Sequence, residues 1–109
     1  TIDVVGLTLD SIQNPGTTLP ALAGAAPAAG TESFGMTVVS DGVTTGTVTG
    51  TYATTYDLPD SATVSDVIIT NTVPTNTEVY GVNYAANIAA LTAAGDYATA
   101  LTYTMTANF

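Results

Sequence analysis

The chain contains no lysine, arginine, histidine or cysteine, whereas nine of its 109 residues are aspartate or glutamate. These absences remove every cationic side chain, every imidazole and every thiol. The familiar catalytic triads and their general bases cannot be assembled from carboxylates, hydroxyls and phenols alone. Paired carboxylates can still hydrolyse glycosides, but acidic residues spread along a chain are more simply solubilising. We therefore expect that the protein is not an enzyme.

The lack of positive charge also limits the partners. The formal net charge at pH 7 is −9, and binding to nucleic acid or to an anionic membrane draws on lysine and arginine. Zinc would need cysteine or histidine ligands, and we expect no cofactor. No apolar run reaches the roughly 18–20 residues of a spanning helix. Neither nucleic acid nor a membrane span is expected.

The residues that are present favour an ordered β-domain. Apolar residues make up 46% of the chain, which argues against disorder despite the acidic balance. Threonine, valine, isoleucine and tyrosine are abundant and suit strands, and glycine and proline recur at short intervals. A chain of this length forms one domain. We expect residues 1–109 to form a single antiparallel all-β sandwich of about seven strands.

Alternating apolar and polar positions locate the strands. In residues 2–9 the alternation changes phase near Gly6, which predicts a bulge or a crossing between sheets. Residues 34–39 and 43–52 flank Asp41-Gly42, a dipeptide that favours a hairpin turn. Residues 64–70 are mostly apolar and predict a largely buried strand. The small-residue segment 19–31 predicts a loop.

The cleanest alternation lies in residues 80–88 and 97–109. Thirteen residues of strand would span about 43 Å, which exceeds the usual strand length. We therefore expect the last segment to bend, or to extend beyond its own domain and pair elsewhere.

Carboxylates and tyrosines are the remaining candidates for a binding site. Asp57, Asp60 and Asp66 are candidate ligands for Ca²⁺, which prefers oxygen; the alternative is a proline-fixed turn with solvated carboxylates. The strand tyrosines suit either a carbohydrate-stacking surface or the core, and the core is favoured because their neighbours are apolar. These strand tyrosines are Tyr80, Tyr84, Tyr97 and Tyr103, whereas Tyr52 and Tyr56 are expected to be more exposed.

Residues 94–106 read AGDYATALTYTMT, an alanine-glycine turn followed by an alternating strand. This pattern resembles the closing hairpin of secreted bacterial and archaeal Ig-like or pilin-like surface domains, including spore-coat-U-type pilin domains. The resemblance covers about the last 16 residues. It implies an Ig-like or Greek-key sandwich at the cell surface that sometimes polymerises by strand exchange. The chain departs from those families in being short and in lacking their cysteine pair.

These observations together predict an extracellular or cell-surface structural subunit of a filament, pilus or surface layer, with copies of itself as partners. The start at Thr1 suggests that a signal peptide was removed or that the domain was excised. The alternative is a surface adhesion or carbohydrate-binding module. Exposed sheet edges can accept strands from neighbours, although both terminal segments could simply complete their own domain. The candidate donated or edge residues are Ile2, Val4, Val5, Leu7 and Leu9, and the candidate acceptor residues are Leu101, Tyr103, Met105 and Phe109.

Overall fold

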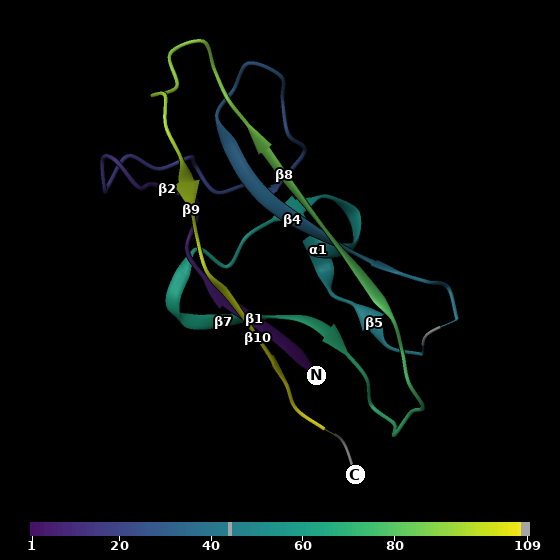
Figure 1. Cartoon of the computed structure of the whole chain (residues 1–109). Coiled ribbons are helices and arrows are strands. Elements are labelled where there is room, and N and C mark those ends of the chain that lie inside the picture. Colours follow the sequence, from purple (N-terminus) through teal and green to yellow (C-terminus); the bar gives the residue numbers. More distant parts are fainter. Residues whose placement is uncertain (44, 108–109) are drawn as a thin grey trace.

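The computed structural model describes residues 1–43 and 45–107. The protein is nearly all-β, with 46% of its residues in strands and 5% in helix, as the composition predicts. The molecule is elongated, with extents of 49 × 26 × 18 Å (Figure 1). Its smallest dimension fits two sheets stacked about 10 Å apart, and all the ladders between named strands are antiparallel.

The first four-stranded sheet contains both ends of the described chain. Its strand order is β10 (Leu101–Met105), β1 (Ile2–Gly6), β7 (Ser61–Thr70) and β5 (Thr47–Val48). β1 lies inside this sheet, and Val4 is opposite Tyr103 on one side and Asp66 on the other. β10 forms one edge of the sheet and β5 forms the other.

The second four-stranded sheet has the order β3 (Ala23–Ala25), β6 (Tyr56–Asp57), β4 (Ser33–Ser40) and β8 (Tyr80–Asn87). Pairing between β4 and β8 continues without a break over eight residues, from Ser33 opposite Asn87 to Ser40 opposite Tyr80. The long, regular strand that the alternation of residues 80–88 predicts is therefore confirmed. β8 forms an edge of this sheet.

Two smaller elements complete the fold. β2 (Asp10–Ser11) pairs with β9 (Tyr97–Ala98) as a two-stranded sheet, and α1 (Gly50–Thr54) is a single helical turn. Within the described residues there are thus ten strands rather than about seven, and five of them have only two or three residues. Among the same residues, no helix is long and apolar enough to cross a membrane.

The core lies between the two four-stranded sheets. Val4 and Ile68 come from the first sheet, and Phe34, Met36 and Val38 come from the second. Val4 and Met36 are fully buried, and Ile68 is 1% exposed. Each such side chain contributes about 1.5–3 kcal/mol when it leaves water. The contacts across the core make the architecture a two-layer sandwich.

The phase change near Gly6 is confirmed. The pairing of β1 with β7 shifts between Val4 and Gly6, after which the chain leaves this sheet for β2. A Cβ atom at Gly6 would lie 2.7 Å from the Ala100 carbonyl oxygen and would collide with the Leu101 side chain. Glycine therefore permits the close crossing of the N-terminal and C-terminal segments.

The expected bend in the final segment is also confirmed. β9 ends at Ala98 and β10 begins at Leu101, so the chain passes from the two-stranded sheet to the first four-stranded sheet. At the break, the Thr99 hydroxyl donates a hydrogen bond of 2.5 Å to the Leu7 carbonyl oxygen. The alternation continues across this break, since Tyr97, Thr99 and Leu101 are partly buried, whereas the residues between and after them, Ala98, Ala100 and Thr102, are exposed.

Two local predictions are wrong. Residues 34–39 and 43–52 do not form a hairpin, because Thr47 and Val48 pair with β7 in the other sheet. The chain then enters α1 at Gly50, whose φ of 44° lies in the left-handed region. β7 is not mostly buried either. Val64 is 65% exposed, and burial is confined to Ile68 and Ile69, where a register shift against β1 lets two successive residues face the core.

Candidate functional site

The N-terminal candidate residues lie in an inner strand. β1 pairs with β10 on one side and with β7 on the other, and Val4 is fully buried in the core. Leu9 packs against the core, whereas Leu7 is 50% exposed. The N-terminal segment is therefore not an edge strand. It completes its own sheet, which was the alternative to strand donation. Donation to a neighbour would require β1 to leave both β10 and β7.

The C-terminal candidate residues form an edge strand. Leu101 packs against the core, Tyr103 is 40% exposed and Met105 is 78% exposed. In the described part of the chain, β10 pairs only with β1, so its other side is open. Phe109 lies outside the described residues. The position of β10 is the one that an acceptor strand requires.

β8 is a second open edge, and sequence reasoning did not select it. Within residues 1–43 and 45–107 it pairs only with β4. Its sequence, YGVNYAAN, contains no charged residue and no proline. The sequence of β10, LTYTM, also lacks both. Natural edge strands are commonly protected by charges, prolines or bulges. The combination of strict alternation and missing charge was the signal that could have identified β8.

Two tyrosines join the open edges. The hydroxyls of Tyr84 on β8 and Tyr103 on β10 are hydrogen-bonded to each other. The Tyr84 ring stacks on Phe34, with centroids 6.2 Å apart and planes 5° apart. The Tyr103 hydroxyl also donates to Met36 Sδ at 3.8 Å. Burial, and then the hydrogen bond with Tyr84, raises the pKa of Tyr103 above its ordinary value.

The tyrosine predictions are confirmed in part. Tyr80 and Tyr97 pack against the core, whereas Tyr84 and Tyr103 are half-exposed. The expected exposure of Tyr52 is wrong, since this residue is 4% exposed. The reason is that α1 turns its ring into the core, where its hydroxyl donates to Asp66 Oδ2 at 2.6 Å. Burial, and then this hydrogen bond, raises the pKa of Tyr52.

The three candidate calcium ligands serve separate local contacts. Asp57 accepts hydrogen bonds from the Thr51 hydroxyl and the Leu58 backbone N–H. Asp60 accepts one from the Thr8 backbone N–H at 3.3 Å, and Asp66 is bound to Tyr52. No group of three acidic residues that could hold a metal ion occurs among the described residues. The structure therefore does not assemble the proposed calcium site.

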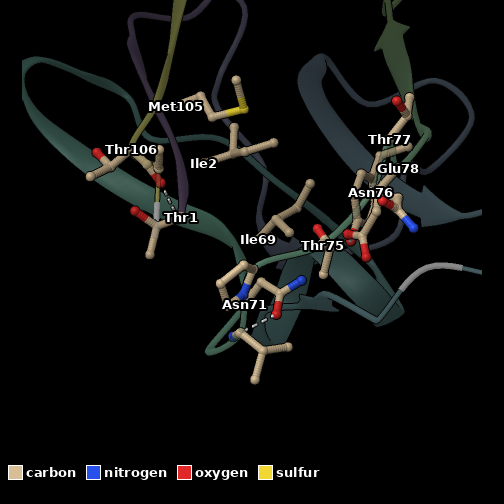
Figure 2. Close-up of a pocket in the computed structure, with 14 residues that line it drawn as sticks. Thr1, Ile2, Ile69, Asn71, Thr75, Asn76, Thr77, Glu78, Met105 and Thr106 are labelled. Atoms are coloured by element: carbon tan, nitrogen blue, oxygen red, sulfur yellow. Dashed lines mark hydrogen bonds between the residues drawn. The ribbon is translucent and has the colours of Figure 1, made fainter. Parts of the chain in front are cut away.

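A pocket of about 500 Å³ lies at the end of the molecule where β1 begins and β10 ends. Ile2, Ile69 and Met105 form its apolar side, and the connection between β7 and β8, including Thr75, forms the other wall (Figure 2). Three distant segments build this pocket. Their distance in the sequence is why no local pattern predicted it.

Glu78 gives the pocket a fixed negative charge. Its Oε1 accepts hydrogen bonds from the Thr45 backbone N–H at 2.8 Å and from the Thr45 hydroxyl at 2.7 Å. Its Oε2 accepts one from the Tyr80 hydroxyl at 2.7 Å. These bonds, with that of Tyr80 the largest cause, lower the pKa of Glu78 to about 2. The carboxylate therefore stays ionised at any physiological pH.

No family model, curated protein or solved structure matches the chain. The resemblance of residues 94–106 to Ig-like and pilin-like endings stays a prediction. A function for the protein has to rest on its own geometry: two uncharged edges, an exposed tyrosine pair and an end pocket.

Proposed function

We propose that the protein is an extracellular structural subunit of a filament, pilus or surface layer, and that its copies associate through the open sheet edges. The observation that carries this proposal is β8. It is an eight-residue edge strand in unbroken register with β4, and it contains no charge and no proline. Such a strand offers a row of unpaired backbone donors and acceptors to a neighbour.

The distribution of charge supports self-association. All nine carboxylates lie outside β8, β9 and β10, so the like charges of two copies need not meet at these edges. Backbone pairing and burial of half-exposed apolar side chains supply the attraction. Among the described residues, β8 and β10 are the two longest edge strands, so each copy can contact two neighbours through them, and such contacts propagate into polymers. The cell-surface location rests on the resemblance of residues 94–106.

Negative-stain microscopy of the purified protein at high concentration tests this function. We expect fibres or sheets from the wild type. Asn83 is an exposed residue in the middle of β8, so Asn83→Glu should reduce assembly by placing a charge on the edge. Thr63→Glu, at an exposed position on β7, adds the same charge and should leave assembly intact. Wild-type protein that stays monomeric at every salt concentration would contradict the proposal.

A second candidate function is that of a surface adhesion or carbohydrate-binding module. The half-exposed rings of Tyr84 and Tyr103 favour it, because amphipathic aromatic rings are common at binding surfaces. Binding of the wild type to a glycan array, lost in Tyr84→Ala and retained by monomeric protein, would support this function over the structural one.

A further inference from the structure

Two phenol rings meet at the surface of the molecule. Tyr84 is on β8 and Tyr103 is on β10, and their hydroxyls are hydrogen-bonded to each other. Tyr84 is 50% exposed and Tyr103 is 40% exposed, so solvent and dissolved reagents reach both rings. The pair therefore meets two conditions for a reaction between side chains, which are contact in the native fold and access from outside.

Contacts with the core hold both rings in place. The Tyr84 ring stacks on Phe34 with centroids 6.2 Å apart, and the Tyr103 hydroxyl donates to Met36 Sδ at 3.8 Å. Each ortho carbon of a phenol is bonded to the carbon that carries the hydroxyl. Since the two hydroxyls are in contact, a modest rotation of the side chains brings an ortho carbon of each ring together. Such orientation makes a reaction within one molecule much faster than one between separate molecules.

The rest of the chain offers an oxidant few competing targets. It contains no cysteine, tryptophan or histidine, and one of its two methionines, Met36, is fully buried. Other tyrosine hydroxyls are bound to groups that are not phenols. That of Tyr52 donates to the carboxylate of Asp66, and that of Tyr97 donates to the Ala93 carbonyl oxygen. A one-electron oxidant in solution therefore finds its best-placed pair of phenols on β8 and β10.

We propose that Tyr84 and Tyr103 form a site of oxidative modification, at which their rings are joined within one molecule as dityrosine. The oxidant belongs to the class of haem peroxidases that use hydrogen peroxide. Each phenol gives up one electron and one proton and becomes a phenoxyl radical. The radicals form a bond between ortho carbons, and the hydrogens of these carbons move as protons to the phenol oxygens. The two electrons and two protons reduce one hydrogen peroxide to two waters.

The product is a covalent link between the edge strands of the two four-stranded sheets, in a chain that has no cysteine for a disulfide. The joined residues are 19 positions apart in the sequence, and the loop that the link closes contains β9. A link of this kind restricts the unfolded chain, as a disulfide does, and so stabilises the fold. The reaction occurs within one molecule and does not depend on the proposed assembly.

Peroxidase treatment of the purified protein at low concentration tests the site. Limiting hydrogen peroxide is added, and the monomer is isolated by size exclusion. We expect the monomer to show dityrosine fluorescence and to lose the mass of two hydrogen atoms. A protease that cleaves before aspartate cuts the chain at Asp96, between the two tyrosines. The resulting peptides stay joined only when they are cross-linked, and tandem mass spectrometry of the joined pair should identify Tyr84 and Tyr103.

Conservative variants show whether this pair is the one that reacts. Tyr84→Phe and Tyr103→Phe each keep an aromatic ring and remove a phenol, so each should lower the dityrosine yield in the monomer at least several-fold. Tyr97→Phe, which removes a phenol bound to a carbonyl oxygen, is the matched control and should react as the wild type does. A wild-type monomer without dityrosine, a yield that is unchanged in Tyr84→Phe, or dityrosine confined to dimers would overturn the inference.

Unfolding provides a second test, because the contact between the rings exists only in the folded protein. In urea, the product that joins Tyr84 to Tyr103 should fall several-fold relative to products that join other tyrosines. The cross-linked monomer, once purified, should melt at a higher temperature than the untreated protein. An undiminished share of this product in urea, or a lower melting temperature after cross-linking, would contradict a site that the native fold presents.

Discussion

The hydroxyl of Tyr84 is hydrogen-bonded to the hydroxyl of Tyr103 across the open side of the sandwich. The two residues belong to the edge strands of different sheets, β8 and β10. Each is also tied to the core, Tyr84 by its stacking on Phe34 and Tyr103 by its contact with Met36. The pair therefore fixes the position of one open edge relative to the other.

A double-mutant cycle measures this link. We expect Tyr84→Phe and Tyr103→Phe each to lower the free energy of unfolding by about 0.5–1.5 kcal/mol, the usual net value of a hydrogen bond. The double variant should lose less than the sum, because the second substitution removes no further contact between the pair. Urea denaturation gives the three values. Tyr97→Phe, which removes a separate bond to the Ala93 carbonyl oxygen, should be additive with Tyr103→Phe. Additivity of the Tyr84 and Tyr103 substitutions would show that the link is absent.

The crossing at Gly6 leads to a prediction about packing. Gly6→Ala places a methyl group 2.7 Å from the Ala100 carbonyl oxygen and against Leu101, so the strands must separate. We expect a loss of about 1–3 kcal/mol in the free energy of unfolding, as for other overpacked sites. Gly81→Ala is the matched control within a strand, because its nearest neighbour would be the Val39 carbonyl oxygen at 3.9 Å. Equal melting temperatures for the two variants would refute the close crossing.

The sequence predicted those features that depend on a local pattern. The alternation of residues 80–88 identified β8 as a strand through the two-residue period of side chains, and the length of the last segment identified its bend through the rise of about 3.3 Å per residue. The phase change at Gly6 marked a real crossing. In each case the residues that carry the signal are adjacent in the chain.

Features that depend on distant partners could not be predicted in this way. Val48 pairs with Ile69 rather than with β4, and no pattern within residues 43–52 distinguishes the two partners. Tyr52 is buried because α1 turns it toward Asp66, a contact that exists only after folding. The end pocket combines Ile2, Ile69 and Met105, which the topology brings together from three strands.

The hydrogen bonds of Glu78 predict a pH-dependent stability. The pKa of its carboxyl falls from an ordinary value of 4.5 to about 2 in the folded protein. Because the pKa is lower in the folded than in the unfolded protein, the ionised carboxylate stabilises the fold. This contribution is present above pH 4.5 and is lost as the pH falls toward 2. Melting temperatures of wild type and Glu78→Gln should therefore differ at neutral pH and converge over this range. Thr45→Val, which removes one donor to Glu78, should weaken the dependence. A difference that persists unchanged down to pH 2 would contradict the role of this network.

The uniform sign of the side-chain charges predicts how assembly responds to salt. Copies that each carry a net charge of −9 repel one another, and this repulsion extends over about 30 Å at 0.01 M salt but only about 10 Å at 0.1 M. The attraction at the edges comes from backbone pairing and apolar burial, which salt screens much less. We therefore expect the concentration at which polymers form to fall as salt rises, and to fall further with divalent cations or acid, which reduce the charge. Light scattering across a salt series measures this concentration. Asn83→Glu should show the steeper dependence, because its added charge lies on β8 itself. Polymers that form more readily at low salt and neutral pH would show that the attraction is electrostatic, and the neutral edges would then not be the contact.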